Sequence, residues 1–118
     1  MGITDDYGAY KNIFAYHQLC WSHPLRKLRE LAKSEKLDNL KKSVCMVSYT
    51  AFSELYHDLE DVLKKPFELS KREEEKKRLM RRFDEIAKIT GNEIEKLRKI
   101  KESLTKNREK YFTCVTIE

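Results

Sequence analysis

Glycine and proline are scarce in this sequence, which has three glycines and two prolines among 118 residues. A β-sandwich or β-barrel needs many turn residues, so the scarcity excludes both architectures. The sequence also lacks a P-loop, a dinucleotide-binding glycine motif and a Ser-His-Asp arrangement. We therefore expect a protein that is not an enzyme and that binds no cofactor.

Long apolar runs and paired cysteines are missing as well. No segment is apolar over the length of a membrane span, and the first residues lack the basic and apolar stretches of a secretory signal. We therefore expect a cytoplasmic chain with no membrane partner. Cys20, Cys45 and Cys114 are odd in number and contain no C-x-x-C pair, which argues against a disulfide scaffold and a zinc ribbon. A single disulfide is left open.

Helical periodicity is the strongest positive signal. Apolar residues recur at spacings of three and four from Leu40 through Val44, Val47 and onward to Leu63, which predicts one long helix capped by Asp38. At about 1.5 Å per residue, this helix is long enough to make the domain elongated. We predict an all-α single domain over 1–118, a four- to five-helix bundle with a long central helix and a charged C-terminal helical hairpin.

The boundaries of the other helices follow from capping signals. Ser22-His23-Pro24 predicts a break between a first helix of roughly 5–21 and a short second helix. A capping box over 70–73 predicts a fourth helix that runs to about Thr90 and ends at Gly91 in a left-handed cap. Asn92 is the predicted cap of the fifth helix. The β-prone tail 112–117 is either a frayed helix end or a strand. These boundaries divide the domain into an aromatic-rich core over 1–66 and a charged hairpin over 67–118.

Charge is unevenly distributed along the chain. Lysine and arginine number 25 against 20 aspartates and glutamates; residues 1–59 hold 8 basic and 7 acidic side chains, and residues 60–118 hold 17 and 13. An excess of cations in one hairpin is typical of a surface that contacts nucleic-acid phosphates. The residues predicted to make these contacts are Arg78, Arg81, Arg82, Lys96, Arg98, Lys99 and Lys101.

The segment 83–97 resembles a helix-turn-helix. Ala87 and Gly91 stand four residues apart, as the small packing residue and the turn glycine do in that motif, and Leu97 falls where the second helix packs back. An ordinary αα-hairpin needs the same glycine and the same apolar spacing, so both interpretations stay open. Glu93 and Glu95 open the second helix and would face phosphates badly.

The predicted first helix carries aromatic residues on more than one face, which indicates a surface shared with a partner. Tyr10, Phe14 and Trp21 are the candidate partner-binding residues, and we expect a homodimer. The leading hypothesis is therefore a small basic helical protein that binds nucleic acid through its C-terminal hairpin. The alternative is a helical protein–protein adaptor or a subunit of an oligomeric scaffold.

Two groups of residues have the spacing of metal ligands. Glu54 and His57 form an E-x-x-H pair of the kind found in di-iron bundles. His17, Cys20 and His23 are ligand types that suit zinc, at successive spacings of three. Neither group has the full ligand set within its own helix, so we predict no metal site while leaving both groups open.

Overall fold

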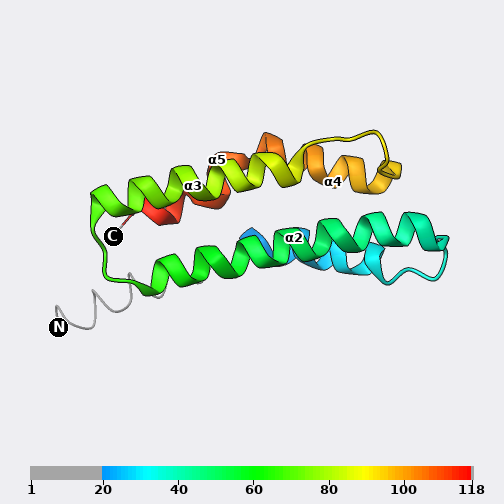
Figure 1. The fold of residues 1–118 in the computed structure, drawn as a ribbon, viewed down its shortest axis with the longest axis horizontal. Coiled ribbons are helices and arrows are strands. Elements are labelled where there is room, and N and C mark those ends of the chain that lie inside the picture. The colour runs from blue at the N-terminus through cyan, green and yellow to red at the C-terminus, as the bar shows by residue number, and fades with distance from the viewer. Residues whose placement is uncertain (1–19, 118) are drawn as a thin grey trace.

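The computed structural model describes residues 20–117, and every described element is helical. A helix over residues 20–32 is followed by α2 (Asn39–Lys64), α3 (Leu69–Ala87), α4 (Glu95–Lys106), α5 (Arg108–Phe112) and the 3-10 turn η1 (Thr113–Thr116). No strand occurs among residues 20–117. The predicted all-α bundle with a long central helix is confirmed (Figure 1).

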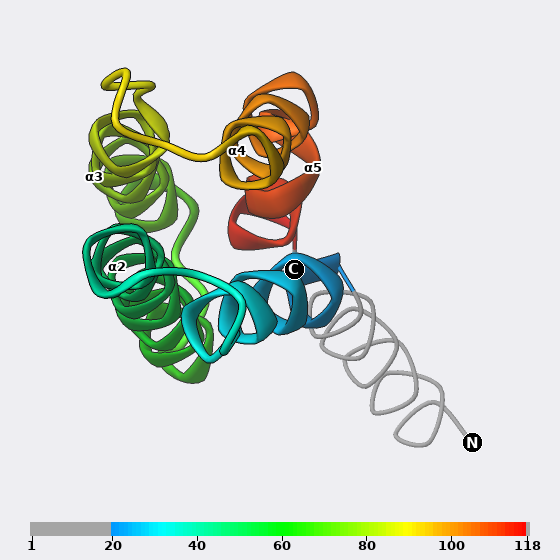
Figure 2. The same cartoon turned by 90° about the vertical axis from the view of Figure 1, so that its right-hand side faces the viewer.

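The helices form an elongated bundle in which helix 20–32, α2, α3 and α4 alternate in direction, while α5 and η1 continue in the direction of α4 (Figure 1). Viewed end-on, helix 20–32, α2, α3 and α4 are arranged as a ring, so helix 20–32 and α4 face each other (Figure 2). The extents of the molecule are 56 × 26 × 21 Å. The long axis follows α2, as its length predicts. No helix in the described part of the chain is both long and apolar enough to cross a membrane.

The long helix α2 begins where the sequence predicts. The carboxylate of Asp38 accepts a hydrogen bond from the Lys41 amide at 2.9 Å, which satisfies an otherwise free donor of the first turn. Its buried stripe runs through residues 45, 48, 52, 55, 59 and 62. Leu40 and Val47, expected in the core, lie beside this stripe and are 78% and 67% exposed. Periodicity identified the helix correctly but gave it too wide an apolar face.

The predicted break at Ser22-His23-Pro24 is wrong, because the helix continues through these residues to residue 32. Trp21, Leu28 and Ala32 lie on one face of this helix and are each 1% exposed or less. Burying two large side chains contributes several kcal/mol, which outweighs the roughly 3 kcal/mol cost of proline in a helix.

Capping signals in the C-terminal half were misleading. Helix α3 begins at Leu69, and its N-cap Glu68 makes no side-chain capping bond, so the capping box predicted at Ser70 does not form. Helix α3 ends at Ala87, earlier than predicted, and α4 is preceded by Ile94 rather than capped by Asn92.

Residues 88–94 separate α3 from α4, and this link decides between the two interpretations of the segment 83–97. Gly91 has the left-handed backbone that the sequence predicts (φ +92°), but it lies inside the link. A helix-turn-helix has a turn of about three to four residues and a steep crossing. Here a longer link joins two helices that lie antiparallel (Figures 1 and 2). The helix-turn-helix prediction is therefore wrong, and the αα-hairpin is the structure.

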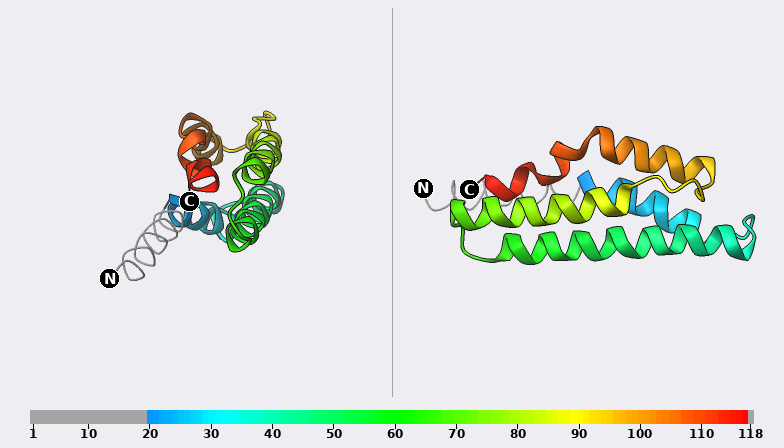
Figure 3. Two further views of the ribbon diagram at one scale, coloured as in Figure 1. Left: turned by 90° about the vertical axis from the view of Figure 1, so that its left-hand side faces the viewer. Right: turned by 45° about the horizontal axis from the view of Figure 1, so that its top comes forward.

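The C-terminal tail belongs to the core and forms no strand. Phe112 and Val115 are completely buried, and η1 lies beside α3 (Figure 3). The guanidinium of Arg72 fixes this tail by donating hydrogen bonds to the carbonyl oxygens of Val115 at 3.2 Å, Leu63 at 3.3 Å and Lys65 at 2.9 Å. Arg72 lies in the almost wholly charged first part of α3, yet it is only 6% exposed.

Candidate nucleic-acid interface

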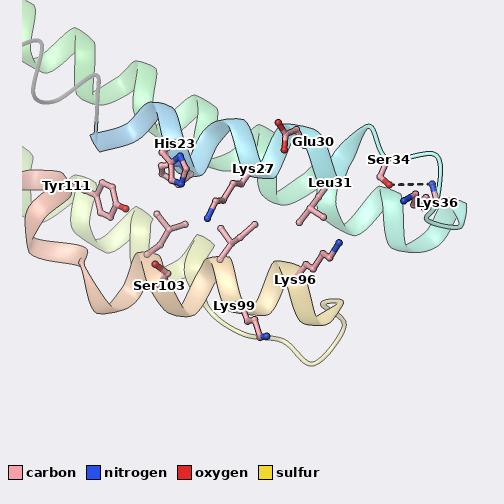
Figure 4. Close-up of a pocket in the computed structure, with 13 residues that line it drawn as sticks. His23, Lys27, Glu30, Leu31, Ser34, Lys36, Lys96, Lys99, Ser103 and Tyr111 are labelled. Atoms are coloured by element: carbon pink, nitrogen blue, oxygen red, sulfur yellow. Dashed lines mark hydrogen bonds between the residues drawn. The ribbon is translucent and has the colours of Figure 1, made fainter.

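A groove lies between helix 20–32 and α4, which are neighbours in the ring (Figures 2 and 4). Its volume is about 560 Å³. Both walls combine apolar and cationic side chains, and Ser34 and Lys36 of the turn after helix 20–32 line one end (Figure 4). The lining residues used below are His23, Lys27, Glu30, Leu31, Lys36, Lys96, Lys99, Ile100, Ser103, Leu104 and Tyr111.

The position of these side chains follows from the buried faces of the two helices. Leu28 and Ala32 turn one face of helix 20–32 into the core, and Leu97 and Leu104 do the same for α4. Residues next to these in sequence are rotated by about 100° and therefore flank the contact. Lys27 and Lys96 occupy such flanking positions. Amphipathicity thus places one cationic side chain on each wall of the groove.

The groove is strongly cationic. Four lysines line it, Lys27, Lys36, Lys96 and Lys99, against the single carboxylate of Glu30. Among the described residues, no ion pair involves Lys27, Lys36 or Lys96. Lys99 has only an exposed contact with Glu95 at 3.6 Å. In Figure 4, Lys27 and Lys96 extend into the space between the helices, whereas Glu30 points away from α4. The positive charge of the groove is therefore largely uncompensated.

Two of the four predicted phosphate-binding arginines, Arg78 and Arg82, are paired with carboxylates. Arg78 makes a two-pronged contact with Asp58, with Nη1–Oδ2 at 2.7 Å and Nη2–Oδ1 at 2.9 Å. Arg82 Nη1 lies 2.7 Å from the same carboxylate, and Arg78 also reaches Glu75 at 2.8 Å. The hydrogen bond from Arg78 is the main cause that lowers the pKa of Asp58. This cluster joins α2 to α3 and reduces the charge that α3 offers to a ligand.

The remaining residues of the predicted site differ in their accessibility. Arg98 forms ion pairs with Glu102 and, at 4.0 Å, with Glu95 on the same helix. Arg81 is exposed and has no ion pair among residues 20–117. Lys96 and Lys99 line the groove. The structure therefore brings these two together with Lys27 and separates them from the arginines of α3.

Lys101 was predicted to contact phosphates, but this prediction is wrong because the side chain is buried. Its side chain is 6% exposed and its ammonium contacts the Glu93 carboxylate at 2.8 Å and the Lys88 carbonyl oxygen at 3.1 Å. Glu93 also accepts hydrogen bonds from the amides of Thr90 at 3.0 Å and Gly91 at 2.9 Å. Lys101 and Glu93 thus hold the link 88–94 against α4, where no phosphate reaches them.

Trp21 is also unavailable to a partner, contrary to the sequence prediction. It is 1% exposed, and its indole N–H donates to the Tyr111 carbonyl oxygen at 3.2 Å. Its ring packs against Tyr111 and Phe112 with centroids 5.2 and 6.0 Å apart. The other candidates, Tyr10 and Phe14, lie outside the described residues. The homodimer stays a prediction.

The candidate metal ligands do not assemble in the described part of the chain. No group of three or more histidine, cysteine, aspartate or glutamate side chains suited to a metal occurs among residues 20–117. His57 Nδ1 contacts Glu60 at 3.1 Å instead of joining Glu54. His17 lies outside the described residues, and His23 lines the groove. Cys20, Cys45 and Cys114 all lie among the described residues, and no disulfide joins any two of them.

Lys27 and Lys36 are groove residues that the sequence reasoning missed. The predicted phosphate contacts all lie within residues 60–118, which hold most of the positive excess, whereas residues 1–59 are nearly neutral. A usable signal was present, since Arg26, Lys27 and Arg29 lie close together in a segment with a single nearby glutamate. Because the acidic residues elsewhere in 1–59 nearly balance these cations, the net charge of that half does not reveal the local excess.

Comparison with known proteins gives one result. The family model described as Transposase IS66 family matches residues 1–117, almost the whole chain. No curated protein and no solved structure matches the chain. Because the match extends over far more than half of the sequence, this helical chain belongs to the Transposase IS66 family.

Proposed function

We propose that this chain is a helical DNA-binding unit that holds backbone phosphates in the groove between helix 20–32 and α4. The observation that carries the proposal is the convergence of unpaired ammonium groups from two elements, Lys27 and Lys36 on one side and Lys96 on the other. Membership of a transposase family supports DNA as the nucleic acid, because transposases act on DNA. We also propose that its role is binding and that it does not itself cut DNA.

This proposal keeps part of the predicted interface and moves its centre. Lys96 and Lys99 remain in it, and Arg81 is exposed on α3. Arg78, Arg82 and Arg98 would have to exchange carboxylate partners for phosphates, which offsets much of the gain in binding. Unpaired lysines carry no such cost, because their only competitors are water and salt.

Counterion release sets the expected salt dependence. For B-DNA the logarithm of the binding constant falls by about 0.9 per phosphate contact for each logarithmic unit of salt. Three to four lysine contacts then predict an affinity loss of roughly 40- to 150-fold for a fourfold rise in salt concentration. We would measure this by fluorescence anisotropy of a labelled duplex. An absence of binding at low salt would refute the proposal.

A matched pair of double variants tests the location. Lys27→Gln with Lys96→Gln removes two groove ammonium groups, and we expect the salt slope to fall by about two. Lys64→Gln with Lys77→Gln removes the same charge from exposed positions outside the groove and is expected to keep most of the slope. Equal losses in both pairs would show that net charge, and not the groove, drives binding. Because the chain is proposed not to cut DNA, a supercoiled plasmid incubated with it and a divalent metal should stay intact.

A second candidate function, self-association as a scaffold subunit, is favoured by one observation. Leu40 and Val47 stand seven residues apart on α2 and expose 78% and 67% of their surface. That spacing is the repeat with which helices pair in coiled coils. Sedimentation velocity on the chain and on Leu40→Ser with Val47→Ser would test it. A dimer that the double variant abolishes is expected, and a monomer at high concentration would exclude this function.

A further inference from the structure

The groove consists of two chemically different parts. Its rim carries lysine ammonium groups from both walls, among them those of Lys27 and Lys96, which suit phosphates (Figure 4). Its floor is apolar and includes Leu31, Ile100, Leu104 and the ring of Tyr111. Leu31 and Ile100 are half-buried, so apolar surface remains accessible inside the groove. A ligand that satisfies only the rim would leave this apolar surface in contact with water.

Double-stranded DNA satisfies only the rim. Its bases are stacked and paired inside the duplex, so it offers the groove its phosphates and sugars. The groove volume of about 560 Å³ falls in the range of roughly 300–1,000 Å³ typical of pockets for small molecules. An unpaired nucleotide is a ligand of this kind, because it joins a flat, largely apolar base face to a charged phosphate.

We propose that the groove accommodates an unpaired nucleotide of single-stranded DNA, with the base on the Leu31 and Ile100 floor and the flanking phosphates at Lys27 and Lys96. This inference rests on the proposed function and names its substrate class. Proteins that bind single strands combine a cationic track with surfaces on which bases stack. The two lysines extend from opposite walls, so a strand that crosses the groove meets one on each side (Figure 4).

Polar groups in the groove complete the fit. The hydroxyl of Tyr111 is directed toward the space between the helices (Figure 4). Ser103 and His23 line the same space and supply further hydrogen-bonding groups. These groups can donate to and accept from the edge of a base, which is exposed only when the base is unpaired. In a duplex the same edge is paired with the opposite strand.

The test compares three ligands on the unaltered 118-residue chain. They are a labelled oligo(dT) strand, a duplex of the same length, and a strand of the same length in which abasic sugars replace the nucleotides. The abasic strand keeps the phosphates and loses the bases. We expect oligo(dT) to bind about tenfold more tightly than either of the others, which corresponds to the lower end of base stacking. Because the same unaltered chain binds all three ligands, a difference in affinity cannot result from a change in folding.

The possible outcomes separate this inference from the proposed function. Equal affinities for oligo(dT) and the abasic strand would overturn the inference and leave phosphate binding intact. A duplex that binds more tightly than oligo(dT) would also overturn it. If none of the three ligands binds at low salt, the proposed function fails as well.

A variant then locates the base. Leu31→Asn makes the floor polar without changing charge, and it is expected to lower oligo(dT) affinity several-fold while leaving abasic-strand affinity unchanged. Leu69→Asn is the matched control, because Leu69 is 50% exposed at the start of α3 and does not line the groove, and it is expected to change neither affinity. If Leu31→Asn unfolds the chain, Ile100→Gln provides the same test from the α4 wall. Unchanged oligo(dT) binding in a folded floor variant would overturn the placement.

Discussion

The buried pair of Glu93 and Lys101 offers the sharpest test of how this chain is held together. Among the described residues it is the most deeply buried ion pair, with side-chain exposures of 1% and 6%. Glu93 accepts hydrogen bonds from the Lys101 ammonium at 2.8 Å and from the amides of Thr90 and Gly91. Glu93→Gln removes its charge while keeping nearly the same size.

The expected loss of stability is about 3 kcal/mol. Removing one partner of a buried ion pair typically costs about 3–5 kcal/mol, because the other charge is left without its partner. Two features place the expected loss of stability at the lower end of this range. The glutamine oxygen still accepts a hydrogen bond from the link, and Lys101 keeps the carbonyl oxygen of Lys88 at 3.1 Å.

The pH dependence of this loss has a definite sign. Burial alone would raise the pKa of Glu93, but hydrogen bonds from Lys101 and Thr90 outweigh it and hold the pKa well below its usual range. The contribution of the pair is therefore complete above the unfolded-state pKa of about 4.3 and declines as the pH falls below it. The stability difference between wild type and Glu93→Gln should be constant near neutral pH and shrink in acid.

Urea denaturation followed by circular dichroism measures this difference. Glu95→Gln is the matched control, because it makes the same substitution at a side chain that is 70% exposed. Its effect should stay within about 0.5 kcal/mol. Equal midpoints for the two variants would refute the reasoning, as would a difference that persists unchanged in acid. Glu93→Gln combined with Lys101→Met should recover part of the loss, because no unpaired charge remains.

Three further substitutions test other contacts. Trp21→Ala should cost about 3–5 kcal/mol in urea denaturation, because its ring is 1% exposed and packed in the core; an unchanged midpoint would contradict this. Asp58→Asn should cost about 1 kcal/mol, since its pairs with Arg78 and Arg82 are partly exposed, and the cost should shrink in acid because the folded-state pKa of Asp58 is lowered. Arg72→Met leaves three carbonyl oxygens without a donor and should speed amide hydrogen exchange in the tail; exchange as slow as in wild type would show that the tail is fixed without it.

Local sequence features were sufficient for the secondary structure that depends on local chemistry. The spacing of apolar residues identified α2, and Asp38 marked its first turn. Gly91 was correctly expected to adopt a left-handed backbone, because residues with a Cβ rarely do. Signals that compete with tertiary contacts failed. Ser70 offers a cap that α3 does not use, and Pro24 lies within a helix whose buried face outweighs its cost.

The sequence alone could not predict which charged side chains are accessible to a ligand. Asp58 is separated from Arg78 by twenty positions, and nothing in their spacing indicates that α2 and α3 bring them together. Lys101 resembles the other cations of α4, yet its position next to the link makes it a buried partner of Glu93. Whether a lysine or arginine is free or neutralised depends on the carboxylate that the fold places beside it.

The sequence by itself determined an all-α chain with one long helix and an excess of positive charge, because helix formation and net charge depend on residue type and local spacing. The tertiary structure decided where that charge is usable. It neutralised Arg78 and Arg82 with Asp58 and opened a groove between Lys27 and Lys96, which lie far apart along the chain. Such a site exists only when distant helices pack side by side, since packing alone decides which charges meet each other and which meet solvent.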